Sequence, residues 1–320
     1  MPVTPPDPAL VARFRADTEA LTGAAPGLIG IAVSGGPDSL ALLVLAHAAF
    51  PGEVRAATVD HRLRPESAAE AAFVAEICAR LEIPHSILAD EAPIQGNIQS
   101  AARGLRYRLL AQWAKGEGAG WLLTGHHRDD QAETLVMRLQ RGAGLSGLAG
   151  IRAATRIGGL AIARPLIGWS RGQLGEIAAA AGLEPVEDPS NADERYDRAR
   201  LRRRLAEAGW IHADALARSA AALAEADAAL EWTVERLIEE RVEGAGGGLT
   251  FDPADIPAEI RRRMLLRILL MLAPADPPRG DALQRLLATL ESGGTATLAG
   301  VKCTGGPLWR FAPAPPRRAK

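Results

Sequence analysis

Residues 28–39 read LIGIAVSGGPDS, and this stretch decides the fold. The apolar run at 28–33 predicts a buried strand, and a helical pattern follows at 39–49. The loop between them consists of Ser34, Gly35, Gly36, Pro37, Asp38 and Ser39. A buried strand joined to a helix by a short loop is the unit from which open α/β sheets are built.

The same alternation of strands and helices continues to about residue 182. Apolar runs predict strands at 54–59, 85–88, 121–124 and 160–163, and helical patterns lie at 67–81, 98–115 and 129–139. Asn97 and Ser170 are suited to begin helices, and Gly182 is suited to end one. We therefore predict an α/β domain with an open parallel sheet and flanking helices, in which ligands bind beyond the carboxyl ends of the strands.

The character of the chain changes after about residue 205. Helical patterns lie at 213–240, 257–272 and 281–290, and leucines recur every seven residues from 216 to 237. This spacing indicates the core seam of a small helical domain more than a coiled coil. Residues 244–248 form a glycine-rich link, and 295–311 a small hairpin. We predict a catalytic domain at 1–210 and a smaller helical domain with a terminal hairpin and tail at 211–320.

The bulk composition excludes several classes of protein. No apolar run of about 18 residues is present, so no membrane span is predicted. The two cysteines, Cys78 and Cys303, are far apart, which excludes a disulfide framework and a CxxC site. We expect a cytoplasmic location. Because the formal net charge is −1, a nucleic acid would have to be held by local basic patches.

The loop at 34–39 has the features of a phosphate-binding site. Its two glycines let the backbone approach a ligand closely, and the following helix start offers unpaired N–H groups. A Walker A loop would carry a lysine, whereas here Asp38 is the charged residue. A carboxylate among phosphates indicates an intervening cation such as Mg²⁺. The alternative is an ordinary strand-to-helix turn in which Asp38 only caps the helix.

Two further segments follow or precede predicted strands and carry basic residues. Residues 60–67 read DHRLRPES, and residues 102–107 read ARGLRY. Arg103 and Arg106 are three apart and share a helix face. Taken alone, each segment is explained as well by a solvated surface.

The segment TGHHRDDQAET at 124–134 follows the fourth predicted strand and opens a helix. Asp130 and Glu133 share a helix face and suit an ammonium ligand. His126 and His127 suggest a metal, but no HExxH spacing supports one. Acidic residues in a first helical turn are also ordinary partners of the helix dipole.

An arginine cluster follows the turn sequence DPSN at 188–191. Its members are Arg195, Arg198, Arg200, Arg202, Arg203 and Arg204. So dense a cluster is typical of a phosphate-contacting patch, and a solvated basic helix is the alternative. The GxGxxG at 142–147 follows a helix, so it is a glycine-rich loop and not a dinucleotide fingerprint.

The loop SGGPDS resembles the PP-loop of the N-type ATP pyrophosphatases, which adenylate a substrate. In order, SGGPDS, DHRLRPES, ARGLRY, TGHHRDDQAET with RGAGLSGL, and DPSNADERYDRARLR resemble the motifs of the tRNA(Ile)-lysidine synthetases over residues 28–205. The resemblance implies an adenine nucleotide alpha hydrolase-like fold. It also implies an ATP-dependent ligation of L-lysine to C2 of the wobble cytidine in a tRNA(Ile) with a CAU anticodon.

The resemblance assigns roles to the matching residues. The loop at 34–39 would hold ATP, with Asp38 as the Mg²⁺ ligand, and the catalytic residues would be Asp38, Asp130 and Arg202. Substrate would be bound by Arg103, Arg106, His127, Asp130, Glu133 and Arg198. The partners implied are tRNA(Ile) and L-lysine, with no membrane, and a homodimer is among the assemblies left open.

Two departures and three rivals accompany this interpretation. Ala199 stands where the family usually has Asn, and the C-terminal part lacks the additional domain of longer members. A sulfur-inserting PP-loop enzyme would need paired or nucleophilic cysteines, and a GMP synthetase a glutaminase segment, which are missing from this sequence. A non-catalytic nucleotide sensor would need neither Asp130 and Glu133 nor the arginine cluster.

Overall fold

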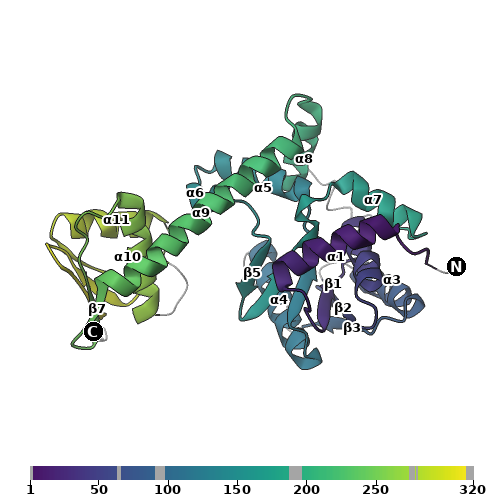
Figure 1. Cartoon of the computed structure of the whole chain (residues 1–320), viewed down its shortest axis with the longest axis horizontal. Helices are drawn as coiled ribbons and strands as arrows, with labels where there is room; N and C mark the ends of the chain where they lie inside the picture. Colours follow the sequence, from purple (N-terminus) through teal and green to yellow (C-terminus); the bar gives the residue numbers. More distant parts are fainter. Residues whose placement is uncertain are drawn as a thin grey trace. The chain divides into compact units, whose positions relative to one another are not determined.

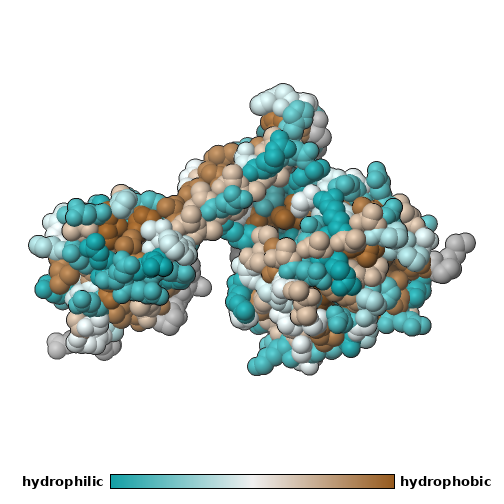
Figure 2. Space-filling model, in the orientation of Figure 1, coloured by the Kyte–Doolittle hydropathy of each residue, from teal (hydrophilic) through white to brown (hydrophobic). Residues whose placement is uncertain are grey.

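The computed structural model describes residues 3–62, 66–90, 98–186, 197–273, 278 and 280–314. The chain forms two compact units, Met1–Ala224 and Glu225–Lys320 (Figure 1, Figure 2). Asn97, residues 63–65 of the second motif, and the DPSN turn with Arg195 lie outside the described residues.

The first unit is built on a six-stranded sheet in the order β3-β2-β1-β4-β6-β5. Its strands are β1 (Ile29–Ala32), β2 (Val54–Asp60), β3 (His85–Ala89), β4 (Trp121–Thr124), β5 (Ala154–Ile157) and β6 (Leu160–Ala163). The strands from β3 to β6 pair in parallel, whereas β5 joins β6 as an antiparallel edge strand. The predicted α/β sheet is confirmed, and β5 adds an edge strand that the sequence did not indicate.

Helices cover both faces of this sheet. One face carries α1 (Pro8–Thr22), α2 (Pro37–Ala49), α3 (Ser67–Arg80) and α7 (Arg171–Ala180), whose side chains share one core with β1 and β2. The other face carries α4 (Ile98–Glu117), which packs its Tyr107, Leu110 and Ala114 on the sheet. Because α2 is apolar on nearly all sides, it is buried between the sheet, α1 and α7.

Two turns of the first unit explain how the chain reverses at its helices. Ser170 caps α7: its hydroxyl accepts from the Gln173 amide at 3.2 Å, as the sequence predicted. Gly182 adopts a φ of 71° just past the helix, a conformation that glycine adopts without steric cost. The remaining elements are α5 (Arg128–Gln140), α6 (Leu145–Leu148), the 3₁₀ turn η1 (Pro165–Gly168) and α8 (Asp197–Glu207).

The second unit combines helices with a five-stranded antiparallel sheet in the order β7-β8-β11-β10-β9. The strands are β7 (Val242–Ala245), β8 (Gly248–Phe251), β9 (Thr295–Leu298), β10 (Val301–Thr304) and β11 (Trp309–Pro313). Against them pack α10 (Ala258–Leu272) and α11 (Gly280–Glu291). Phe251 and Trp309 meet edge to face in this core, with ring centroids 5.5 Å apart.

The prediction of a glycine-rich link at 244–248 was wrong. These residues form a hairpin, because Gly246 and Gly247 take φ values of 54° and 82° and turn β7 back on β8. Two adjacent residues with positive φ make the tight turn that matches the twist of paired strands. The second unit therefore contains more strand than a helical domain with one terminal hairpin.

The heptad leucines lie on one long helix, α9 (Ala213–Arg241). Leu230 and Leu237 pack against the core of the second unit, as a core seam would. Leu216 and Leu223 belong to the residues of the first unit, so the boundary between the units falls within α9.

Among the described residues, no helix combines the length and the apolar character needed to cross a membrane.

Candidate active site

The loop at residues 34–39, here called the phosphate loop, follows β1 directly, and its own hydroxyl groups stabilise it. The Ser39 hydroxyl accepts from the Ser34 amide at 3.1 Å and donates to the Gly36 carbonyl at 2.9 Å. Gly35 has a φ of 84°, which a side chain would strain. Helix α2 begins at Pro37 with no side-chain cap on its first amides. The start of α2 is therefore uncapped by side chains, which is compatible with the predicted anion site.

Gly125 brings the loop after β4 against the phosphate loop. A Cβ at this position would lie 3.1 Å from the carbonyl oxygen of Asp38 and 3.3 Å from the amide nitrogen of Ser39. Both contacts are with backbone, which cannot rotate away. The single glycine of the TGHH segment therefore allows this close packing, a role that the sequence reasoning missed.

Asp38 lies on α2 with one carboxylate oxygen available. Its Oδ1 is buried and has no hydrogen-bond partner among the described residues. Its Oδ2 lies 3.3 Å from Nε2 of His127. A buried carboxylate oxygen without a donor, at a helix start suited to phosphates, fits a Mg²⁺ ion shared with a nucleotide. The described residues contain no cluster of three or more His, Cys, Asp or Glu that would hold a metal by themselves.

His127 connects the phosphate loop to the acidic start of α5. Only 1% of its side chain is exposed, and Nδ1 and Nε2 lie 3.6 Å from Asp129 and Asp130 respectively. Burial opposes protonation, but the nearby carboxylates of Asp129, Asp38 and Asp130 raise the pKa of His127 to about 9. When neutral, Nδ1 accepts the Asp129 amide at 3.2 Å and caps α5. His127 thus holds three carboxylates around one ring.

Asp130 and Glu133 lie together on α5, as predicted, and both contact arginines of α8. Arg198 donates from Nε to Glu133 at 2.7 Å and from Nη2 to Asp130 at 3.0 Å. Arg202 donates from Nε to Glu133 at 2.7 Å. Burial would raise the pKa of Glu133, but these two guanidiniums lower it. The carboxylate pair predicted to hold an ammonium is occupied here by two cations of the chain itself.

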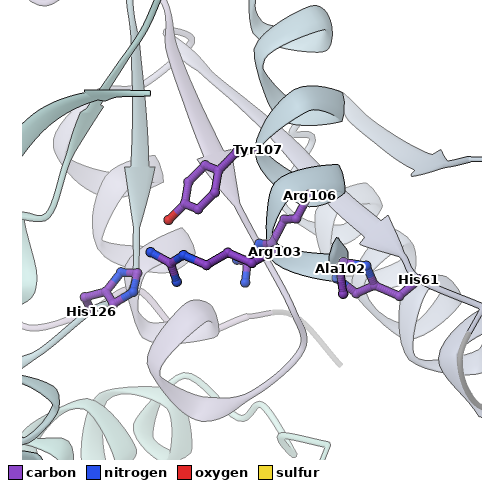
Figure 3. A pocket seen from close by; sticks show the side chains of 6 residues that line it. All are labelled: His61, Ala102, Arg103, Arg106, Tyr107 and His126. Carbon is purple, nitrogen blue, oxygen red and sulfur yellow. The ribbon is translucent and has the colours of Figure 1, made fainter. Parts of the chain in front are cut away.

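Arg103 and Arg106 line a separate cavity of about 190 Å³ on the α4 side of the site. Its lining residues are His61, Ala102, Arg103, Arg106, Tyr107 and His126 (Figure 3). In Figure 3 the Arg103 side chain extends between Tyr107 and His126. Among the described residues that line the cavity none is a carboxylate, and His61 Nδ1 has no partner among them. Two guanidiniums therefore give the cavity a positive charge that suits an anionic group.

His126 is neutral in this cationic surrounding. Burial, together with the charges of Arg164, Arg106, Arg103 and Arg198, lowers the pKa of His126 to about 3. Its Nδ1 lies 2.9 Å from the Thr124 hydroxyl. A neutral imidazole can donate or accept a hydrogen bond without adding charge.

Arg164 is a second residue that the sequence reasoning missed. It directly follows β6, is 3% exposed, and donates to the Arg152 carbonyl at 2.6 Å. Its position just beyond the carboxyl end of a parallel strand was the available signal. The segment at 142–147 follows α5, as expected for a segment that is not a dinucleotide fingerprint, but only its first part is a loop, because α6 begins at Leu145.

The predicted residues thus fall into two groups. Asp38, His127, Asp130, Glu133, Arg198 and Arg202 are joined by successive polar contacts of 2.7 to 3.6 Å. Arg103 and Arg106 lie in the neighbouring cavity and reach His126 electrostatically.

The sheet and its phosphate loop define a PP-loop protein, and the PP-loop domain family matches residues 13–208. The tRNA(Ile)-lysidine synthase of Novosphingobium aromaticivorans is 48% identical over 96% of this chain and 94% of its own. That of Zymomonas mobilis subsp. mobilis is 45% identical over 91% of this chain and 90% of its own. The chain belongs to the tRNA(Ile)-lysidine synthase family.

A solved structure shares the fold at much lower sequence similarity. The U34-tRNA thiolase NcsA from Methanococcus maripaludis superposes with a TM-score of 0.54 at 17% identity, covering 68% of this chain and 79% of its own. This likeness concerns the fold alone.

Proposed function

We propose that this chain ligates L-lysine to C2 of the wobble cytidine of a tRNA(Ile) with a CAU anticodon, using ATP and Mg²⁺. One observation carries the proposal. A continuous series of contacts runs from Asp38 beside the phosphate loop, through His127 and Asp130, to Glu133 and the arginines of α8. The residues that we assign to the nucleotide, to the amine and to the tRNA are therefore neighbours, which supports a two-step ligation at one site.

The first step is adenylation of the cytidine. Its O2 attacks the α-phosphorus of ATP, the bond to the β-phosphate oxygen breaks, and pyrophosphate leaves. The start of α2 and the hydroxyls of Ser34 and Ser39 hold the phosphates while negative charge develops. Mg²⁺ held by Asp38 would neutralise charge on the phosphate oxygens.

The second step is attack by lysine. Its ε-amine, once deprotonated, attacks C2 of the cytidine, and the bond from C2 to the adenylated oxygen breaks to release AMP. We assign the ammonium groups of lysine to Asp130 and Glu133, and a carboxylate there can accept a proton. Since Arg198 bridges this pair, lysine has to compete with its guanidinium for Asp130. Arg202 then stabilises charge on the leaving phosphate.

The cationic cavity supplies an anion site for the same reaction. Arg103 and Arg106 face no carboxylate there, so an anionic group of a substrate, the lysine carboxylate or a phosphate, complements it. The neutral His126 contributes a hydrogen bond without a competing charge.

The test is AMP release with radiolabelled lysine. We expect AMP to form at a stoichiometry of one per lysine incorporated, only when ATP, Mg²⁺, lysine and the tRNA are all present. AMP formation of equal rate without lysine and tRNA would contradict the proposal.

Asp38→Asn isolates the role of the carboxylate. We expect adenylation to fall at least one-hundred-fold with the fold intact, because the Mg²⁺ ligand is lost. Asp281→Asn is the matched control: Asp281 is also the second residue of a helix, α11, so it loses the same dipole interaction without touching the phosphate loop. Equal rates for the two variants would remove Asp38 from the mechanism.

A further inference from the structure

Trp210 is a large apolar side chain that the proposed chemistry does not use. Its exposed fraction is 79%, higher than that of any other large apolar side chain among the described residues. It lies three residues beyond the end of α8, next to Gly209, which has a φ of 54°. A single exposed apolar side chain is ordinary by itself, so the surroundings of this indole decide whether it has a role.

The helix that leads to Trp210 is strongly basic. Residues 197–207 carry five arginines against one aspartate and one glutamate. Arg198 and Arg202 face Glu133, whereas Arg203 and Arg204 are exposed, with Arg203 in an exposed ion pair with Glu207 at 3.5 Å. An exposed aromatic ring beside exposed guanidiniums is the combination that binds unpaired RNA, through base stacking and phosphate contacts.

The second highly exposed tryptophan has a different surrounding. Trp232 on α9 is 61% exposed and stacks with Arg236 at 5.0 Å, between Glu231 and Glu235. Glu231 pairs with Arg263 at 2.6 Å and Glu235 with Arg267 at 2.7 Å, so the charges beside Trp232 are compensated within the chain. Arg236 already lies over the Trp232 ring, whereas Trp210 follows the arginine-rich helix of the first unit.

We propose that Trp210 stacks on an unpaired base of the tRNA substrate near the target cytidine, while Arg203 and Arg204 contact the adjoining phosphates. This inference rests on the proposed function. Arg202 contacts Glu133 of the carboxylate pair, and Trp210 follows Arg202 by eight residues along the chain, just beyond the end of α8. Trp210 is thus a binding residue beside the reacting base and takes no part in the chemistry.

The experiment compares Trp210→Ala, Trp210→Phe and Trp232→Ala in the full chain. The probe is a transcribed tRNA(Ile) with a CAU anticodon, and both direct binding and steady-state rates are measured. Because loss of one stacked base weakens binding by about five- to one-hundred-fold, we expect that rise in Kd and in KM for tRNA with Trp210→Ala. Trp210→Phe should retain most of the affinity, and Trp232→Ala all of it, with KM for lysine unchanged throughout.

Two further measurements separate the alternatives. Arg203→Gln should lower the slope of log K against log salt by about one, as expected for one lost phosphate contact. Unfolding temperatures should not change, since the indole is exposed. A wild-type Kd for tRNA in the Trp210→Ala variant would overturn the proposal. Conversion of a dimer into a monomer by the same substitution would also overturn it, because the indole would then serve self-association. A wild-type chain that binds this tRNA through Trp210 but forms no lysidine would instead contradict the proposed function.

Discussion

Replacing Gly125 by alanine tests whether the phosphate loop must lie against the loop after β4. The added Cβ would be 3.1 Å from the Asp38 oxygen, 3.2 Å from its carbonyl carbon and 3.3 Å from the Ser39 nitrogen. All three atoms are backbone, so relief requires the loop itself to move by a few tenths of an ångström. Overpacking of this kind costs about 1 to 3 kcal/mol.

The displaced atoms belong to the residues that would hold Mg²⁺ and phosphate. At about 2 to 4 °C per kcal/mol for a unit of this size, we expect an unfolding temperature roughly 2 to 12 °C lower. Misplacement of a catalytic loop by a fraction of an ångström should lower the rate of AMP release about ten-fold or more. Thermal unfolding followed by circular dichroism and the tRNA- and lysine-dependent AMP assay measure the two effects.

Gly175→Ala is the control for this change. Gly175 lies inside α7, and a Cβ there would meet nothing within 4 Å. We expect stability to rise by about 0.5 to 1 kcal/mol, because alanine loses less entropy in a helix, with unchanged activity. If Gly125→Ala were as stable and as active as Gly175→Ala, the close packing of the two loops would be refuted.

Three other predictions follow from buried groups. Glu133→Gln should cost about 1 to 3 kcal/mol of unfolding free energy, less than a fully buried pair because Arg198 is partly exposed, and should raise KM for lysine at least ten-fold. The pKa of His126 falls from 6.5 in the unfolded chain to about 3 in the folded chain, so below pH 6.5 the unfolded chain binds a proton that the folded chain does not, and the free energy of unfolding declines. His126→Gln should flatten this decline, which denaturant titrations between pH 7.5 and 5.5 measure. Burial raises the thiol pKa of Cys78 and Cys303 to about 12, so neither should react with iodoacetamide at pH 8 in the native state. The variant with alanine at both positions should still release AMP, whereas a sulfur-inserting enzyme would lose its activity without its cysteines.

Part of the candidate site could be predicted from the sequence because several of its residues lie in contiguous segments. The loop at 34–39 and the pair Asp130 and Glu133 each follow a strand and open a helix, so local rules place them at one edge of the sheet. The exposed position of Trp210 was not readable, because a tryptophan is ordinarily buried and only the fold decides otherwise.

The sequence by itself determined the alternation of strands and helices and the identity of the phosphate loop, since apolar periodicity and glycine conformations are local properties. Only the tertiary structure decided which residues that are distant in the sequence contact one another. Gly125 meets the Asp38 backbone 87 residues earlier in the chain, and Arg198 reaches Glu133 across 65 residues. The hairpin at Gly246 and Gly247 likewise became part of a five-stranded sheet through pairing with β11. Such contacts depend on packing between distant segments, which no local pattern records.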